Sequence, residues 1–332
     1  MATQSAGERL FGYCTNVHPG TSVAEVKQQL ATHAVNVRER LGRNQPLPVG
    51  LWFSQPVANE LAEPGQRDAF SNWLDENHLR PYTLNGFPYS NFHQPVVKHE
   101  VYEPDWTTPQ RQAHTRQLAE LLAGMIGENE HGSISTLPVG WPRSKNRADE
   151  SERLAAAGRR LIELAQGLAA LHDRTGRRIT VNIEPEPGCL LDTADDIVAF
   201  FKQHILAHAD DEQPIREHLG VCHDICHSAV MFEPQQQAIE QYRAAGIRVG
   251  KVQISAAVRA PFDQMSPQQA TEALGQLRNF SEPKYLHQTK IRNDEGQLQM
   301  FEDLGDALKR FGDTPPGQAC RVHFHVPINV AT

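Results

Sequence analysis

The sequence lacks several features that mark common classes of protein. Its 332 residues include only five cysteines, an odd and scattered set that forms no disulfide framework. No segment approaches the roughly 20 apolar residues of a membrane-spanning helix, so we expect no membrane insertion. The first residues, MATQSAGERLFGY, contain no basic region followed by an apolar run. We therefore expect no signal peptide and a cytoplasmic location.

Positive charge and glycine-rich loops are also scarce. The formal net charge is −8, whereas proteins that bind nucleic acids normally present a basic stripe, so we expect no nucleic-acid partner. No glycine-rich phosphate loop follows an early predicted strand, which disfavours a doubly wound dinucleotide-binding fold. The chain also lacks linkers rich in Gly, Pro or Ser, short repeats and low-complexity tracts. We therefore predict a single domain over residues 1–332.

What the sequence contains is a regular alternation of short apolar runs with longer amphipathic segments. Ser22 with Glu25, and Thr193 with Asp196, predict two of the helix starts. The apolar runs predict strands over 10–17, 48–53, 79–87, 133–140, 178–188, 219–227, 249–255, 284–291 and 320–328. Strands that alternate with helices indicate a parallel sheet. Eight or nine such units in a chain of this length predict an α/β protein with a (β/α)8 TIM barrel.

Polar side chains stand at the ends of nearly all these strands, where a barrel of this kind places its catalytic groups. Because side chains alternate along a strand, Glu184 shares a face with Glu186, and His323 with His325. If these faces point into the barrel, carboxylates, imidazoles and an amide converge there. The candidate metal ligands are Glu184, Asp224, Gln253, His287, His323 and His325. Mixed oxygen and nitrogen ligands predict a divalent metal, with Zn²⁺ or Mn²⁺ favoured.

The segment GVCHDICHSAV (220–230) illustrates this chemistry. Three residues separate Cys222 from Cys226, so they are no CxxC redox pair, and a CxxxC zinc half-site would need a second half that the sequence lacks. Cysteines beside a strand are more often small buried apolar residues. Asp224 and His227 instead place a carboxylate at a strand end and an imidazole one turn later. Alone, this spacing of Asp224 and His227 is more often structural. Together with Glu184 and with His323 and His325 near the end of the chain, it predicts a metal site.

A substrate pocket is predicted from further polar and aromatic residues. Asn16 and His18 follow the first predicted strand, and Asn85 lies near the end of the third. His93 and Trp106 lie in a polar and aromatic loop over 88–106, whose length is typical of functional loops, often lids. His18 precedes Pro19 and Gly20, so shaping a turn is the alternative role for it.

Seven segments resemble a known family. YCTNVHPG, LNGFPYSNFH, SISTLPVGW, IEPEPGCLLDT, GVCHDICHSAVMFE, KVQIS and VHFHVP, in this order over nearly the whole chain, resemble the metabolite traffic protein EboE family of xylose isomerase-like TIM barrels. The resemblance implies that Glu184 and Asp224 ligate a metal, with His227 beside them. It places Gln253 where a His is usual, and His323 and His325 where a Glu is usual. It also implies a role in moving or preparing a secondary metabolite, with partner proteins encoded nearby.

These features favour a metal-dependent isomerase or epimerase that acts on a small polyhydroxylated metabolite. Glu186 is the candidate base, with Lys251 or His227 steadying the enediolate; a buried ion pair is the alternative role for Lys251. The departures at Gln253 and the late histidines leave a second hypothesis, a non-catalytic metabolite carrier with a relic pocket. A metal-dependent phosphodiesterase ranks last, because an acidic surface opposes phosphate binding.

Overall fold

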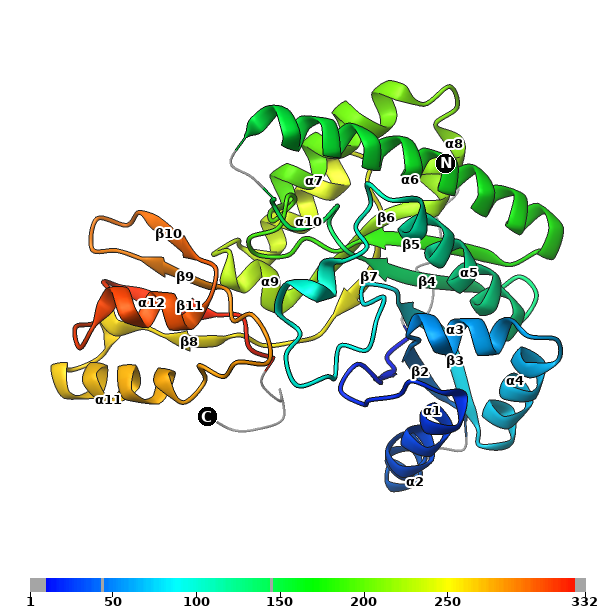
Figure 1. The fold of residues 1–332 in the computed structure, drawn as a ribbon, viewed down its shortest axis with the longest axis horizontal. Helices are drawn as coiled ribbons and strands as arrows, with labels where there is room; N and C mark the ends of the chain where they lie inside the picture. The colour runs from blue at the N-terminus through cyan, green and yellow to red at the C-terminus, as the bar shows by residue number, and fades with distance from the viewer. Residues whose placement is uncertain (1–9, 43–44, 144–145, 326–332) are drawn as a thin grey trace.

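Seven parallel strands form the main sheet of the protein. The computed structural model describes residues 10–42, 45–143 and 146–325. Within them the sheet follows the order of the sequence (Figure 1): β1 (Tyr13–Cys14), β2 (Leu47–Trp52), β3 (Leu79–Asn85), β4 (His131–Thr136), β5 (Arg178–Ile183), β6 (Leu219–Asp224) and β7 (Val249–Gln253). Every neighbouring pair is parallel.

The parallel sheet curls, so that strands distant in its order approach each other. β4 contacts β7, although two strands lie between them in the sheet. Asn16, just after β1, lies 3.5 Å from Gln253 at the end of β7, measured from Nδ2 to Oε1. Sequential parallel strands that curl inside a layer of helices form the predicted TIM-barrel fold, which is confirmed.

Helices cover the outside of this sheet. They are α1 (Val23–Leu30), α2 (Asn36–Arg40), α3 (Gln55–Ala62), α4 (Gln66–Glu76), α5 (Pro109–Met125), α6 (Arg147–Thr175), α7 (Ala194–Phe200), α8 (Gln213–His218), α9 (Ile225–Val230) and α10 (Gln235–Ala244). The predicted starts are confirmed: the Ser22 side chain accepts from the N–H of Glu25, and Thr193 and Asp196 form a capping box. Among the described helices, none combines the length and apolar character that crossing a membrane requires.

The last third of the chain departs from the predicted alternation. Eight or nine strand–helix units were expected in one barrel, but β8 (Val258–Ala260), β9 (Thr289–Arg292), β10 (Leu298–Phe301) and β11 (Ala319–Val322) form a separate antiparallel sheet in the order β10-β9-β11-β8. Gly296, with φ of 78°, lies in the short loop between β9 and β10. A glycine in such a loop is typical of a β-hairpin, and the prediction of a barrel strand over 284–291 did not take it into account. Part of the predicted strand 320–328 lies outside the described residues.

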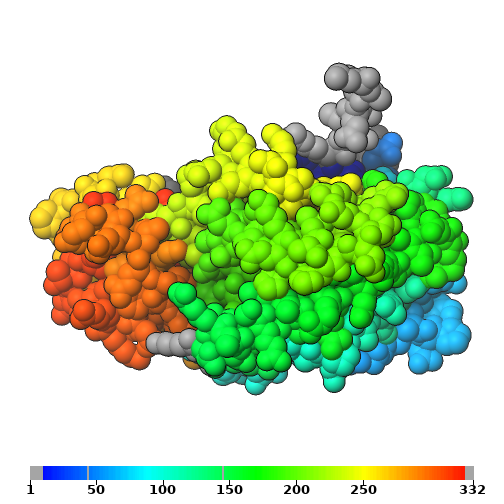
Figure 2. All heavy atoms as spheres, turned by 90° about the horizontal axis from the view of Figure 1, so that it is seen from above, coloured from blue at the N-terminus to red at the C-terminus, as the bar shows by residue number. Residues whose placement is uncertain are grey.

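The antiparallel sheet has its own hydrophobic cluster. Two helices pack with it, α11 (Pro267–Arg278) and α12 (Leu304–Phe311). The cluster contains Ala260, Phe262, Ala270, Leu277, Ile291, Leu304, Cys320 and Val322. In Figures 1 and 2 this C-terminal lobe, coloured from yellow to red, lies at one end of the molecule, and Figure 1 shows α9 beside it. It therefore adjoins the edge of the barrel where β6 ends.

The close packing of α6 depends on one glycine. A Cβ at Gly158 would overlap the carbonyl oxygen of His204, whereas a Cβ at Gly167 in the same helix would lie 3.6 Å from the Arg116 guanidinium, an ordinary contact. We expect Gly158→Ala to destabilise the protein by about 1–3 kcal/mol through overpacking. Gly167→Ala should stabilise it by about 0.5–1 kcal/mol, since alanine favours helix. Urea unfolding of both variants checks this, and equal effects would contradict it.

Candidate metal centre

Asp224 ends β6 and caps the helix α9 that follows. Its Oδ1 accepts the backbone N–H groups of Cys226 at 2.7 Å and His227 at 3.1 Å, and the Ser255 hydroxyl at 2.7 Å. Burial raises the pKa of this carboxyl, but His227, His325 and these hydrogen bonds outweigh burial and hold the pKa below its usual value. Within residues 10–42, 45–143 and 146–325, no hydrogen bond reaches Oδ2. Asp224 is thus a fixed, ionised carboxylate with one oxygen available.

His227 lies one turn into α9 and is buried. Its Nδ1 lies 2.8 Å from the carbonyl oxygen of Pro185, so Nδ1 carries the proton and donates it there. A neutral ring then has its lone pair on Nε2. Burial lowers the pKa of His227, but Asp224, Glu186 and Glu184 together raise it above its usual value. The surrounding field therefore favours a positive charge at this place.

His323 follows β11, and a chain of hydrogen bonds fixes its tautomer. The Gln288 amide nitrogen donates to the Tyr102 hydroxyl at 3.0 Å and to Glu186 Oε1 at 2.9 Å. The amide oxygen of Gln288 must then accept from His323 Nδ1, which lies 2.7 Å away. His323 Nε2 is left with a lone pair, and it faces His325 Nε2 at 2.9 Å. Such a partner on the far nitrogen is typical of histidines that ligate metals.

Three groups of potential ligand atoms result, each with its atoms within 4.8 Å of one another. They are Asp224, His227 and His325; Glu186, His227 and His323; and Cys226, His323 and His325. The fold thus brings the 224–227 segment together with His323 and His325. Both His323 and His325 belong to these ligand groups, although the sequence could not decide which of the two faces the pocket.

Glu184 lies beside these groups and belongs to none of them among the described residues. Its Oε1 accepts from the Gln253 amide nitrogen and lies 3.7 Å from His227 Nδ1. Burial raises the pKa of Glu184 to about 7. Gln253 therefore turns its nitrogen, and not its ligating oxygen, toward the centre. Its oxygen faces Asn16.

Glu186 is held by the loop that was expected to be functional. Tyr102, in the short helix η2 (Lys98–Tyr102), donates its hydroxyl to Glu186 Oε1 at 2.7 Å. Burial raises the pKa of Glu186. Two donors on one oxygen orient this carboxyl firmly. Lys251 points elsewhere: its Nζ donates to the Ser135 hydroxyl at 3.0 Å and lies 3.4 Å from the Leu84 carbonyl oxygen.

The predicted pocket residues divide into two sets, the first consisting of Asn16, His18 and His93 and the second of Asn85 and Trp106. Asn16 Oδ1 and His93 Nε2 are buried without a hydrogen-bond partner among the described residues. His18 stacks on His33, at 4.1 Å between ring centroids, and its Nε2 lies 2.6 Å from the Tyr13 hydroxyl. The other two are enclosed. Asn85 Oδ1 accepts from Phe87 N and Ser135 Oγ, and Trp106 has no exposed surface and donates to Thr136.

His287 lies apart from the centre. It is buried, its Nε2 is 3.5 Å from Glu282 Oε1, and its ring stacks on Phe324. It belongs to none of the ligand groups found among the described residues. The sequence favoured His287 because imidazole is a common ligand. The next residue, Gln288, contacts the centre instead, through its hydrogen bonds with Glu186 and His323.

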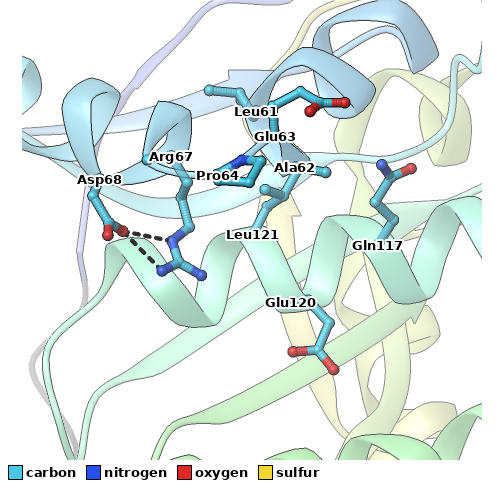
Figure 3. A pocket seen from close by; sticks show the side chains of 10 residues that line it. Leu61, Ala62, Glu63, Pro64, Arg67, Asp68, Gln117, Glu120 and Leu121 are labelled. Carbon is cyan, nitrogen blue, oxygen red and sulfur yellow. Dashed lines mark hydrogen bonds and ion pairs between the residues drawn. The ribbon is translucent and has the colours of Figure 1, made fainter.

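A shallow surface pocket is found elsewhere, between the α3–α4 turn and α5 (Figure 3). Its volume is ≈ 250 Å³, and its lining includes Leu61, Pro64, Arg67, Gln117, Glu120 and Leu121. Two of the charged side chains there form ion pairs, Arg67 with Asp68 and Glu120 with Arg174. It brings together no catalytic set, so the centre at β5 and β6 is the candidate functional site.

Comparison with known proteins gives distant matches among solved structures. No family model and no curated protein sequence matches this chain. Solved structures similar to it include a D-tagatose 3-epimerase-like protein, at 14% identity and a TM-score of 0.49 over 83% of this chain and 89% of that one. A xylose isomerase-like TIM barrel protein from Mycobacterium smegmatis, in complex with magnesium, has 14% identity and a TM-score of 0.48 over 85% and 90%. At such values the likeness assigns neither family nor activity.

Proposed function

We propose that the protein binds a divalent metal ion through Asp224, His227 and His325. The observation that carries the proposal is the convergence of these ligand atoms within 4.8 Å, although they come from distant parts of the chain. One carboxylate and two imidazoles suit Zn²⁺, with Mn²⁺ the alternative. When bound, such an ion polarises a carbonyl and its neighbouring hydroxyl and acidifies the adjacent C–H bond.

The residues around the centre fit the positive charge of a metal ion. The field at His227 favours a cation, and the far nitrogens of His227 and His323 are bonded away from the centre. Tyr102 and Gln288 hold Glu186 beside His323. Tyr102 comes from the loop of the barrel, and Gln288 comes from the C-terminal lobe. We therefore infer that the barrel and the C-terminal lobe act as one unit.

The reaction that this arrangement supports best is isomerisation or epimerisation of a small polyhydroxylated metabolite. Glu184 is the carboxyl group at the centre that joins none of the described ligand groups, so it is free to move a proton, with Gln253 orienting it. This exchanges the roles predicted from the sequence, where Glu184 was a ligand and Glu186 the base. Asn16 Oδ1 and His93 Nε2, which are buried without a hydrogen-bond partner among the described residues, would bind substrate hydroxyls, because leaving them unpaired is costly. Membership of the EboE metabolite traffic family would fit this function.

Elemental analysis and isotope exchange test the proposal together. Wild-type protein, purified without a His-tag and dialysed against Zn²⁺ or Mn²⁺, is incubated in D₂O with a panel of ketoses, aldoses and polyols. We expect bound metal and incorporation of solvent deuterium into one substrate class, abolished by a chelator. Absence of metal at this centre after reconstitution would overturn the proposal. Tight binding of a metabolite without exchange would indicate a carrier.

A further inference from the structure

A second set of potential ligands lies at the opposite end of the barrel. His218 immediately precedes β6, whereas Asp224 ends it. Six residues of strand span roughly 20 Å, so the two places are well separated. His172, Glu217 and His218 bring ligand atoms within 4.8 Å of one another here.

His218 is prepared to act as a ligand. Its Nδ1 lies 2.8 Å from the carbonyl oxygen of Ile179 and donates to it. The other nitrogen, Nε2, is buried and has no hydrogen-bond partner among the described residues. The side chain has 0% exposure. A neutral imidazole of this tautomer has its lone pair on Nε2, and a bond from the far nitrogen to a carbonyl is typical of metal-bound histidine.

Two helices end at this cluster. His172 lies in the last turn of the 29-residue helix α6, and Glu217 and His218 lie in the last turn of α8. The two helices pack against each other, as Figure 1 shows. The carboxyl end of a helix carries partial negative charge, which stabilises a cation. His172 and Glu217 are only half-buried, so the cluster is open to ions from solvent.

We propose that His172, Glu217 and His218 form a second metal site, selective for Zn²⁺, which joins α6 to the start of β6. Two imidazoles and a carboxylate are a common zinc donor set, and three protein ligands leave a fourth position for water. The site is independent of the proposed function at the other end of the barrel.

The donor atoms make this site selective for zinc. Arg178 acts electrostatically on His218, and Glu217 acts on Arg248, so two guanidinium groups stand close to the cluster. Their positive charge repels Zn²⁺ and Mg²⁺ alike, so the ligands discriminate between the two ions, and Mg²⁺ prefers oxygen ligands. Zn²⁺ retains its affinity because it bonds to imidazole nitrogen. We therefore expect excess Mg²⁺ to leave bound zinc in place.

Zinc stoichiometry tests the proposal. Asp224→Asn is used as the background, because it disables the centre at the carboxyl end. After equilibrium dialysis against ZnCl₂, we expect Asp224→Asn to hold about one zinc ion per chain, and Asp224→Asn with His172→Ala to hold none. His208→Ala, which removes an exposed histidine outside the cluster, is the matched control and should leave the zinc bound.

A zinc content unchanged by His172→Ala in that background would overturn the second site, as would its absence from Asp224→Asn itself. Glu217→Gln provides a second variant with little risk to folding, and circular dichroism of each variant checks the fold. Failure of the proposed function gives a different result: wild type and Asp224→Asn would then bind the same amount of zinc.

Discussion

Asp224→Asn is expected to abolish activity by releasing the metal from the barrel centre. Loss of a residue that hydrogen-bonds to a metal ligand typically weakens metal affinity by about 10–100-fold. Loss of a carboxylate ligand itself should therefore weaken metal binding by more than about 100-fold. Asparagine keeps the Oδ1 that accepts from Cys226, His227 and Ser255. The cap of α9 should therefore survive, with a change in stability within about 1 kcal/mol. Metal titration and urea unfolding measure the two effects separately.

Glu233→Gln is the matched control for this change. Glu233 is a half-buried carboxyl that accepts the N–H of Ala194 at 2.9 Å, and it belongs to none of the ligand groups found among the described residues. This variant should keep both metal and activity. If Asp224→Asn retained wild-type affinity for the metal at the centre, Asp224 would not be a ligand.

Glu184→Gln is expected to separate proton transfer from metal binding. The amide keeps the size of the side chain and can still pair with Gln253, but it cannot carry a proton to and from substrate. General acid–base groups typically contribute about 10²–10⁴-fold to rate, so deuterium exchange should fall by at least about 100-fold while metal content stays at the wild-type level. Exchange kinetics and elemental analysis of the same preparation give both readouts.

Glu186→Gln completes the comparison between the two carboxyl groups. The amide oxygen of glutamine can still accept from Tyr102 and Gln288, so the orientation of His323 should survive, and this variant should keep both the metal and deuterium exchange. The opposite pattern would restore the assignment made from the sequence. In that pattern Glu184→Gln loses the metal, and Glu186→Gln keeps it but loses exchange.

Much of the fold and part of the site follow from local sequence. Alternating apolar runs and amphipathic segments predict parallel strands and their covering helices, because the two periods are properties of neighbouring residues. The capping box of Thr193 and Asp196 is local in the same way. Asp224 and His227 also belong here, since an Asp that caps a helix lies near the first-turn residue three positions later. These predictions need no knowledge of distant contacts.

The tertiary structure alone decided the rest. Whether Glu184 or Glu186 faces the histidines depends on Tyr102 and Gln288, which come from a loop and from the C-terminal lobe. Long-range register decides that β9 pairs antiparallel with β11. It also decides that the described ligand groups include both His323 and His325 and leave out His287. A one-residue shift in register moves every side chain of a strand to the other face. Residue types and spacing therefore named the chemistry, and packing between distant segments decided which side chains meet to perform it.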